Sequence, residues 1–301
     1  MPMRDMLGSR MKEYEQRNQY WLQKRTPVCI RVDMRAGHTF TKGFKRPFDE
    51  IFMKTMQQTA KYMCENIEGA VLSYQQSDEI TIILQDYKKL NTEAWFDYRT
   101  DKLCSISASM ATMAFNKYFG ANVAEFILSE DAKEAIVKGL PKLPYIVDSF
   151  YYLTDSEKDY AQILLKAAEK GAMFDARCFN IPKEEVTNLL YWRQLDAARN
   201  SVQMVGQANF SHKELQNKSC SNIQDMLMEK YNINWNDFPT TQKRGSCAIK
   251  IHYQNPEVDI KDGPDIRSTW FIDNEIPQFK GEGREYVEKL INFEEEYTVS
   301  R

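Results

Sequence analysis

Carboxylates at two places far apart in the chain have the residue types and flanking sequence for phosphoryl-transfer chemistry. Asp33 ends the short segment PVCIRVD, and Asp78 and Glu79 lie within YQQSDEITIIL, residues 74–84. The residues from Glu79 onward have the apolar, β-branched composition of a buried strand, so the polar residues before them predict a hairpin connection. Carboxylates that meet at one end of a sheet repel each other unless a cation joins them. Mg²⁺ prefers oxygen ligands and recruits phosphates, and two such ions can hold the attacking and leaving oxygens of a phosphoryl transfer.

Asp78 and Glu79 are expected to differ in role. Successive residues of a strand point to opposite faces of the sheet, so Asp78 is predicted to bind metal and Glu79 to support it. The alternative is that Ser77 and Asp78 form only an Asx-type turn, in which the side chain bonds to nearby backbone. The hairpin sequence alone leaves both interpretations open.

The loop after Asp33 favours the metal-site interpretation. Its sequence MRAGHTFTKGFKRP, residues 34–47, combines small residues with basic side chains. The basic residues are Arg35, His38, Lys42, Lys45 and Arg46. A bound triphosphate needs cations, N–H donors and close approach of the backbone. The loop matches no P-loop spacing, and a basic loop is often merely solvated, so the prediction depends on its position directly after Asp33.

The order of the predicted elements would bring these carboxylates together. Apolar patterns predict strands and helices in the order β-α-β-β-α-β, the ferredoxin-like split unit of an α+β fold. The strands are expected at 27–33, 70–74, 79–84 and 172–181, and the helices at 48–67 and 99–118. In such an antiparallel sheet the end of the first strand lies beside the central hairpin, so Asp33 and Asp78 should meet.

The remaining segments are expected to surround this core. Helices are predicted at 3–22, 155–170, 184–204 and 211–230, a strand at 246–254, and an irregular insertion at 120–153. The small residues of helix 99–118 that are expected to face the sheet are Ser105, Ala108, Ser109 and Ala111. We therefore divide the chain into a catalytic core, 1–181, with an insertion near 120–170, and a helical region, 182–301, whose terminal strand packs on the core.

Composition excludes several classes of protein. The six cysteines include no CxxC pair, which predicts free thiols rather than a zinc site or disulfides, and three scattered histidines argue against a histidine-rich metal site. No apolar run approaches the roughly 20 residues that cross a bilayer, so no membrane association is expected. The charged N-terminal residues lack the apolar stretch of a signal peptide, and the expected location is the cytoplasm.

Segments spread over most of the chain resemble the tRNA-His guanylyltransferase superfamily, whose members polymerise nucleotides in the 3′-to-5′ direction. They occur in the order expected for that superfamily. The matching segments are RVDMRAGHTF (31–40), KRPFDE (45–50), YQQSDE (74–79), WFDYRTDKLCSISAS (95–109), FDAR (174–177), YWRQLDAARNSVQM (191–204) and KRG (243–245). Residues 196–219 look like the bacterial and archaeal like-protein branch, phage-borne versions included.

The resemblance implies a palm-type catalytic domain with two Mg²⁺ ions held by Asp33, Asp78 and the backbone carbonyl of Met34, with Glu79 also catalytic. ATP or GTP serve as substrates and tRNA as the acceptor, and the family assembles as homo-tetramers. The implied nucleotide-binding residues are Asp33, Met34, Arg35, Ala36, Gly37, His38, Arg46, Ser77, Asp78, Arg99 and Lys102. The implied reaction activates a 5′-monophosphorylated RNA end with a nucleotide, and the 3′-hydroxyl of an incoming NTP then attacks that end.

Two departures from the family pattern refine this expectation. Met34 stands where the family has glycine, which is tolerable if only the carbonyl is used. The guanylyltransferase branch has a histidine and asparagines in the stretch after WRQ, where this chain has Ala198, Asn200, Ser201 and Met204. The departures favour template-dependent repair of shortened tRNA 5′ ends over guanosine addition to tRNA-His. The residues also leave open a palm-type nucleotide cyclase and a non-catalytic RNA-binding module.

Further residues are divided between structural and functional roles. Asp175 and Arg177 are expected to form an ion pair, and Trp192 to lie in the core. Arg193, Asp196 and Asn200 lie three or four residues apart on one helix and predict an exposed polar stripe that is solvated or contacts RNA or another subunit. Lys213, Lys218, Lys243 and Arg244 are candidates for tRNA contact, although charged runs are generally solvated.

Overall fold

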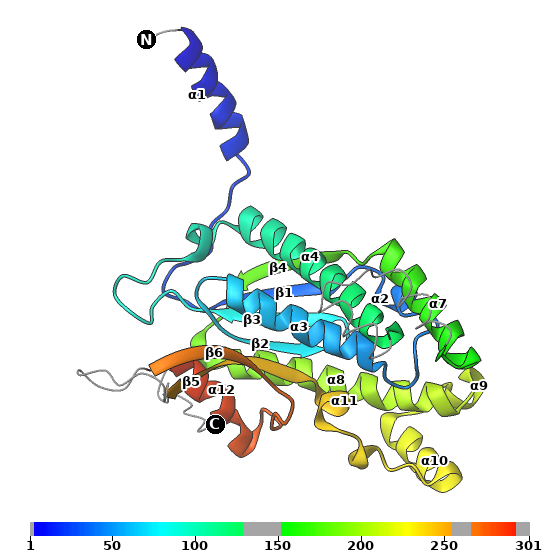
Figure 1. Ribbon diagram of the computed structural model, residues 1–301. Coiled ribbons are helices and arrows are strands. Elements are labelled where there is room, and N and C mark those ends of the chain that lie inside the picture. Colours follow the sequence, from blue (N-terminus) through cyan, green and yellow to red (C-terminus); the bar gives the residue numbers. More distant parts are fainter. Residues whose placement is uncertain (1–2, 129–151, 255–265, 293–301) are drawn as a thin grey trace.

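An antiparallel sheet forms the centre of the molecule, with helices on both of its faces (Figure 1). The structure is a computed structural model and describes residues 3–128, 152–254 and 266–292. Its elements are α1 (Met3–Gln16), β1 (Val28–Met34), α2 (Gly37–Phe40), α3 (Glu50–Asn66), β2 (Ala70–Gln76), β3 (Glu79–Leu84), α4 (Thr100–Ile127), α7 (Asp155–Lys170), β4 (Phe174–Asn180), α8 (Val186–Asn209), α9 (His212–Leu215), α10 (Cys220–Tyr231), α11 (Thr240–Arg244), β5 (Ser246–Gln254), β6 (Ile266–Asp273) and α12 (Arg284–Asn292).

The described strands form one six-stranded sheet in the order β4-β1-β3-β2-β5-β6, and every neighbouring pair is antiparallel. The β-α-β-β-α-β order predicted from the sequence is therefore present, with β1 in the middle of the first four strands. The β1 ladders place Asp33 directly opposite Glu79 on β3 and opposite Asp175 on β4. The two strands that follow the core, β5 and β6, extend the same sheet beyond β2.

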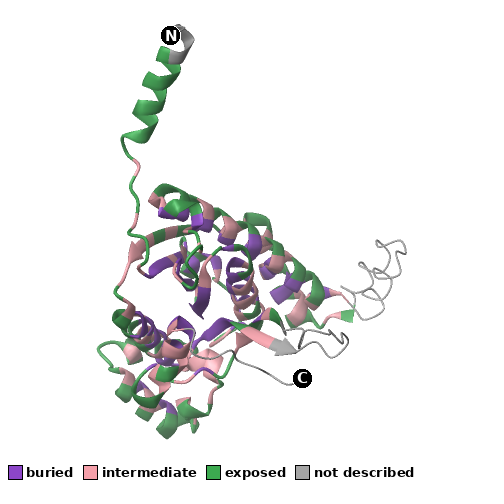
Figure 2. Ribbon diagram, turned by 90° about the vertical axis from the view of Figure 1, so that its left-hand side faces the viewer, coloured by how far each residue is buried: buried purple, intermediate pink, exposed green. Residues whose placement is uncertain are grey.

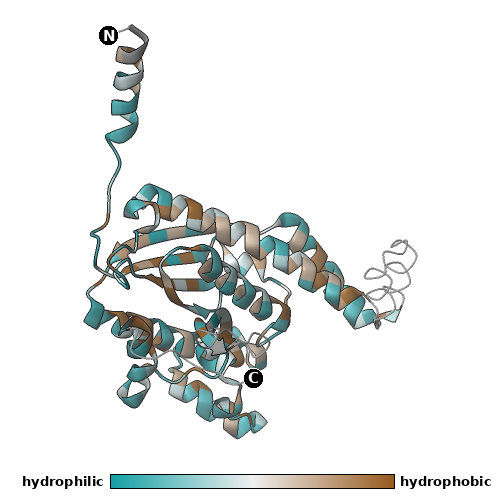
Figure 3. Cartoon of the chain, turned by 60° about the vertical axis from the view of Figure 1, so that its left-hand side comes forward, coloured by the Kyte–Doolittle hydropathy of each residue, from teal (hydrophilic) through white to brown (hydrophobic). Residues whose placement is uncertain are grey.

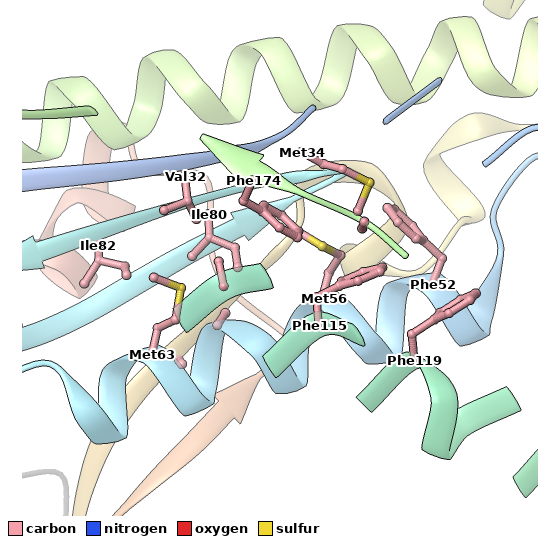
Figure 4. Close-up of a cluster of buried hydrophobic side chains, with 14 of the residues drawn as sticks. Val32, Met34, Phe52, Met56, Met63, Ile80, Ile82, Phe115, Phe119 and Phe174 are labelled. Atoms are coloured by element: carbon pink, nitrogen blue, oxygen red, sulfur yellow. The ribbon is translucent and has the colours of Figure 1, made fainter. Parts of the chain in front are cut away.

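Strand alternation separates two hydrophobic cores on the two faces of the sheet. Val32 and Met34 of β1 pack with Phe52 and Met56 of α3 and with Phe115 of α4 (Figure 4). Figure 2 shows the buried residues gathered along the strands and the inner sides of these helices, and Figure 3 shows the hydrophobic residues gathered there too. Asp33, which lies between two residues of that core, therefore faces the opposite side of the sheet.

The second face of the sheet is covered by α8 and α12. Cys29 and Ile83 pack there with Val186 and Leu190 of α8 and with Val287 of α12. Because side chains alternate along β1, this face also receives Arg31 and Asp33, two charged residues in the middle of the sheet. The α8 face therefore combines an apolar half with a charged half, and the charged half lies at the Asp33 end of the strands.

Helix α3 illustrates why the sequence folds locally as it does. Asp49 precedes the first turn, and its carboxylate accepts a hydrogen bond from the Phe52 N–H, which satisfies one of the free donors of the helix start. Phe52, Met56 and Met63 then recur at the spacing of one helix face and are buried against the sheet. The amphipathic helix predicted at 48–67 is confirmed at Glu50–Asn66.

Several boundaries differ from the sequence-based prediction. Helix α1 ends at Gln16 rather than at residue 22, and it stands away from the rest of the molecule (Figure 1). Helix α4 continues to Ile127, so the start of the predicted irregular insertion is helical. The rest of that insertion, 129–151, lies outside the described residues. Strand β6 and helix α12 were not predicted.

The packing face of α4 was predicted only in part. Ala111 is buried as expected, but Ser105 and Ser109 are exposed, and Leu103 and Phe115 are buried instead. Aromatic and leucine side chains contribute more buried apolar area than serines do, so they determine which side of the helix faces the core. The division at residue 181 stays a prediction, and the β2–β5 ladder joins residues on both sides of it.

The cysteines of the described residues are free thiols. Cys29, Cys64 and Cys247 are buried, whereas Cys104 and Cys178 are half-buried with their sulfur atoms 3.5 Å apart. No helix among the described residues is both long enough and apolar enough to cross a membrane.

Candidate active site

The end of β1 and the β2–β3 hairpin are joined through their backbones. The Met34 N–H donates a hydrogen bond of 3.1 Å to the carbonyl oxygen of Asp78. Asp33 precedes Met34 on the strand, so the structure brings the carboxylates of residues 33 and 78 to the same end of the sheet. Residues 33 and 78 therefore lie at the same end of the sheet, as the order of the strands predicted. Their role as metal ligands stays a prediction.

Asp33 lies in an environment that favours its protonated form. Burial raises the pKa of Asp33 to about 6, and the negative charges of Asp78, Glu79 and Asp175 add to this effect. Arg177 acts in the opposite direction but does not cancel it. Neither Asp33 nor Asp78 has an ion-pair partner among the described residues. Two crowded carboxylates without a neutralising cation are the setting in which a bound divalent ion lowers the electrostatic free energy most.

Gly37 allows the loop after β1 to pass directly over the hairpin. A Cβ atom at residue 37 would overlap the carboxylate oxygen Oδ2 of Asp78. The preceding residue, Ala36, has left-handed backbone angles (φ 55°, ψ 42°), which turn the chain into α2. The Arg35 N–H donates a 2.8 Å hydrogen bond to the Met173 carbonyl and so ties the loop to β4. The small residues predicted to permit close approach thus do so toward Asp78.

Glu79 is neutralised by an arginine that the sequence analysis placed elsewhere. The Nε and Nη2 atoms of Arg193 on α8 donate hydrogen bonds of 2.7 Å and 2.9 Å to the two carboxylate oxygens of Glu79. Both residues are buried, and Arg193 also donates to Asp196 at 3.0 Å. The predicted exposed polar stripe is therefore wrong, because Arg193 points to the sheet. Arg31, on the same face, lies 3.8 Å from Glu79.

The prediction from strand alternation needs a correction. Asp78 lies in the turn between β2 and β3, so alternation along β3 does not determine where its carboxylate points. Glu79 is the direct cross-strand neighbour of Asp33 and lies on the same face. Glu79 differs from Asp33 and Asp78 because its carboxylate accepts two hydrogen bonds from Arg193. It does not differ from Asp33 in the face of the sheet on which it lies. Trp192, expected in the core, is 53% exposed and lies 4.7 Å from the Arg193 guanidinium.

The segment KRG, residues 243–245, packs against strand β2 of the hairpin and supports its turn. The Tyr74 hydroxyl donates a 2.6 Å hydrogen bond to the Arg244 carbonyl. Gly245 has φ 82°, and a Cβ atom there would overlap the Gln75 carbonyl oxygen. Gln75 in turn donates from its side chain to the Ser77 carbonyl at 2.9 Å, and Ser77 itself has a left-handed φ of 48°. The turn that carries Asp78 is thereby held by residues about 170 positions away.

A cavity of about 270 Å³ opens beside Asp78. It lies between the loop after β1, the start of α3 and the C-terminal part of α8, and we call it the nucleotide cavity after the ligand predicted for its residues. Its basic residues are His38, Lys42, Lys45 and Arg46, and its other lining residues include Gly37, Thr41, Asp49, Ser77, Asp78, Met204 and Gln207. A second cavity, of about 700 Å³, continues from it and shares His38, Arg46 and Gln207.

Asp49 lines the nucleotide cavity, although it was not among the predicted site residues. Its Oδ2 atom accepts hydrogen bonds from the Lys45 N–H at 3.0 Å and from the Tyr160 hydroxyl at 2.5 Å. Its Oδ1 atom caps α3. The KRPFDE segment held the available signal, since Asp is one of the residues preferred at the N-cap of a helix. Asp49 therefore anchors the basic loop onto α3 and α7.

Arg99 and Lys102 lie at the other end of the sheet. Thr100 on the first turn of α4 contacts Cys178 through its carbonyl, whereas Thr112 accepts from the Phe174 N–H near Asp175. Twelve residues of helix separate these two contacts, which is about 18 Å at 1.5 Å per residue. The Arg99 guanidinium pairs with Asp101 at 2.9 Å. Of the predicted nucleotide-binding residues, these two are the ones that the structure does not bring to Asp33 and Asp78.

The donor set at the sheet end fits a magnesium site. Two carboxylates and a neighbouring backbone carbonyl, that of Met34, offer oxygen atoms only, which Mg²⁺ prefers. Burial and, to a lesser extent, the neighbouring carboxylates raise the pKa of Asp33, so a cation there would stabilise its ionised form. No group of three or more His, Cys, Asp or Glu side chains suited to a metal occurs among the described residues, so a metal here would rely on carbonyl, water or substrate oxygens as well.

Known proteins resemble the chain in both sequence and fold. The family model described as tRNAHis guanylyltransferase (Thg1) matches residues 8–182. The structure of a bacterial tRNA(His) guanylyltransferase (Thg1)-like protein in complex with ATP superposes with a TM-score of 0.70 and 37% identity, covering 95% of this chain and 98% of that one. A bacterial Thg1-like structure in complex with GTP gives a TM-score of 0.68, 35% identity, and coverage of 95% and 99%. An uncharacterised protein of Acanthamoeba polyphaga mimivirus is 27% identical over 81% of this chain and 77% of its own length.

The fold and these similarities define the chain as an enzyme of the nucleotidyltransferase class. The family model covers more than half of the 301 residues. The chain belongs to the tRNAHis guanylyltransferase (Thg1) family.

Proposed function

We propose that this enzyme is a template-dependent 3′-to-5′ nucleotidyltransferase that adds NTPs to the 5′ ends of tRNA. The observation that carries the proposal is the meeting of Asp33 and Asp78 at one end of the sheet, beside a cavity lined by four basic side chains. Its catalytic core corresponds to a ferredoxin-like, palm-type domain, which the strand order β4-β1-β3-β2 with crossover helices α3 and α4 supports.

The residues of the nucleotide cavity would bind and orient an ATP or GTP. Lys42, Lys45 and Arg46 supply positive charge for the triphosphate, and Gly37 lets the backbone lie close to it. Asp33, Asp78 and the Met34 carbonyl would hold two Mg²⁺ ions, which when bound supply the charge that stabilises the attacking and leaving oxygens. The Glu79–Arg193 pair fixes the face of β3 next to Asp33.

The proposed reaction has two steps. A 5′-monophosphate of the RNA attacks the α-phosphate of ATP or GTP, which forms a 5′-5′ pyrophosphate linkage and releases pyrophosphate. The 3′-hydroxyl of an incoming NTP then attacks the RNA 5′-phosphate, which extends the RNA by one nucleotide and releases the mononucleotide. An RNA with a 5′-triphosphate needs only the second step and releases pyrophosphate there.

Template dependence is proposed from the residues of α8. Asn200, Ser201 and Met204 line a small cavity that also contains Ser77 of the hairpin, and Ala198 lies on the far side of the same helix. These positions differ from the guanylyltransferase branch of the family, in which guanosine is added without a template. A single added guanosine and a soluble cyclic nucleotide are the competing products that the test below distinguishes.

The test is incubation with 5′-truncated tRNAs, Mg²⁺ and each labelled NTP alone. The expected result is addition of the nucleotide that pairs with the opposite strand, with the preference changing when that template base is changed. Addition of guanosine whatever the template base would replace the proposal by guanosine addition proper. Label that appears only in a soluble cyclic or dinucleotide product would replace it by nucleotide cyclisation or signalling-nucleotide synthesis, and no incorporation at all would overturn it.

Assembly and location are proposed from the family resemblance. We propose a homo-tetramer in the cytoplasm, which light scattering of the purified chain and fractionation of producing cells would test. A monomeric mass at micromolar concentration would overturn the tetramer.

A further inference from the structure

Another basic cavity lies between α8 and α11, and neither Asp33 nor Asp78 lines it. It has a volume of about 420 Å³, within the range of small-ligand pockets, and lies between α8, α10, α11 and the segment 277–280. We call it the α8–α11 cavity. Its aromatic and basic lining residues are Tyr191, Arg199, Trp235, Lys243, Arg244 and Lys280. No Asp or Glu among the described residues lines it, although the whole chain has a net charge of −3.

The positive charge of this cavity is only partly neutralised. Arg199 pairs with Asp196, which is also bonded to Arg193. The side chains of Arg244 and Lys280 have no ion-pair partner in the parts of the chain that the structure describes, and Lys280 is exposed. The Lys243 ammonium donates a 2.5 Å hydrogen bond to the Asn236 carbonyl, which is a neutral acceptor rather than a carboxylate. Basic side chains that line a cavity without carboxylates favour an anionic ligand.

An aromatic ring in the cavity is fixed in position. The Trp235 indole N–H donates a 2.9 Å hydrogen bond to the Ser201 hydroxyl on α8, which holds the ring at the cavity wall. The Lys243 ammonium lies 5.9 Å from the centre of the same ring. A planar base that stacks on an aromatic ring, with its phosphate on neighbouring cations, is how proteins bind unpaired nucleotides of RNA.

The α8–α11 cavity is connected to the catalytic end of the sheet. It shares Lys243 and Arg244 with the small cavity that contains Ser77, and that small cavity shares Ser77 and Met204 with the nucleotide cavity. The α8–α11 cavity therefore adjoins the small cavity, which in turn adjoins the nucleotide cavity beside Asp78. By contrast, a free NTP with its Mg²⁺ would favour a site that offers carboxylates, which this cavity lacks among the described residues.

We propose that the α8–α11 cavity binds an unpaired nucleotide of the RNA strand opposite the shortened 5′ end, that is, of the template strand. The base would stack on Trp235, and Arg244 and Lys280 would hold the adjoining phosphates. The inference rests on the proposed function, because a template-dependent enzyme must hold the unpaired strand opposite the shortened 5′ end while it adds nucleotides. It adds a binding site for the template that is separate from the nucleotide cavity.

The test is RNA binding measured by fluorescence anisotropy without any NTP, using an acceptor-stem duplex with an unpaired template strand and a blunt duplex of the same sequence. Lys280→Glu should weaken binding of the overhang duplex roughly tenfold and reduce its salt dependence by about one charge, while binding of the blunt duplex stays the same. The matched control is Lys117→Glu, an exposed lysine on α4 across the sheet, which should change neither affinity by more than about twofold.

A covalent map completes the test and needs no charge change. 5-Iodouridine placed in the unpaired strand should crosslink on irradiation to Trp235 or Tyr191, as read by mass spectrometry of the digested protein. Crosslinks confined to other elements would overturn the proposal. So would equal losses in Lys280→Glu and Lys117→Glu, or competition by free mononucleotide as strong as that by the overhang strand.

The two proposals can fail separately. A protein that adds no nucleotide to tRNA but shows Lys280-dependent binding of the overhang duplex contradicts only the proposed function. A protein that adds templated nucleotides with full efficiency in the Lys280→Glu variant, and binds both duplexes equally, contradicts only the α8–α11 site.

Discussion

Acidic residues on neighbouring strands at one end of the sheet have opposite electrostatic environments. Glu79 is buried against Arg193, which satisfies both of its carboxylate oxygens. Asp33 and Asp78, one strand and one turn away, have no cation of the protein bound to them among the described residues, and the pKa of Asp33 rises to about 6 because of burial and neighbouring carboxylates. The protein itself balances the charge of Glu79, whereas under the proposed function a bound cation and substrate would balance that of Asp33 and Asp78.

The comparison predicts the largest loss of activity for Asp78. Asp78→Asn keeps the size of the side chain but removes the negative charge, so nucleotide addition should fall by at least about 10³-fold, which is about 4 kcal/mol of transition-state stabilisation. Unfolding in urea should change little, because no protein cation is left unpaired. The matched control is Asp175→Asn, an exposed carboxylate on β4 paired with Arg177 at 3.1 Å. If Asp78→Asn kept near-normal addition, the assignment of the site would be wrong.

The Glu79–Arg193 pair should matter most for stability. Arg193→Met removes both hydrogen bonds to the buried carboxylate of Glu79 and leaves only the longer ion pair with Arg31 at 3.8 Å, so the free energy of unfolding should fall by about 3 kcal/mol. Arg177→Met, which breaks the exposed pair with Asp175, should cost less than about 1 kcal/mol. Urea unfolding followed by circular dichroism measures both.

A double variant sharpens that prediction. Glu79→Gln combined with Arg193→Met removes both charges, and much of the lost stability should return. If Arg193→Met and Arg177→Met were equally destabilising, the contrast between a buried and an exposed pair would not hold.

The smallest expected effect is a stabilisation that depends on pH. The pKa of Asp33 is raised in the folded protein, so ionisation opposes folding, and this penalty grows as pH rises from about 3.8 to about 6. In EDTA, Asp33→Asn should therefore be more stable than the wild type at pH 7.5, by about 1 kcal/mol after allowance for solvent screening, and by only about a third of that at pH 4.5. Urea unfolding at both pH values measures it. Mg²⁺ should narrow the gap at pH 7.5 by stabilising only the wild type; a gap that is the same at both pH values contradicts the explanation.

The part of the fold that positions Asp33 and Asp78 was predictable from the sequence. The apolar strands and the amphipathic helix at α3 have strong local patterns, and their order fixes which strand ends meet. The helix predicted at 99–118 stopped just before Gly120, but α4 continues through this glycine to Ile127. Nothing lies close to the position of the missing Cβ atom at Gly120, so no contact there requires a glycine. Strand β6 was missed because its sequence adjoins the charged, Pro- and Gly-containing residues 255–265.

Pairings between distant segments could not be predicted. Arg193 and Glu79 are 114 residues apart, and a helix with three spaced polar residues normally places them in solvent. Only the tertiary position of α8 over the sheet turns Arg193 inward and leaves Trp192 outward. Arg99 and Lys102 were assigned by family resemblance, which carries no information about distance within one chain. They precede Thr112, which contacts Phe174, by thirteen and ten residues, so they lie about 15–20 Å from that contact along α4.

The close approach of Gly245 to the Gln75 carbonyl has a consequence for how the enzyme can be divided. The turn carrying Asp78 rests on backbone contributed from beyond residue 240, whereas the family model ends at residue 182. A fragment that stops at residue 182 would retain Asp33 and Asp78 and lose the backbone contacts that support the turn carrying Asp78. We therefore expect that minimal versions of this enzyme must keep residues 244–245 and β5.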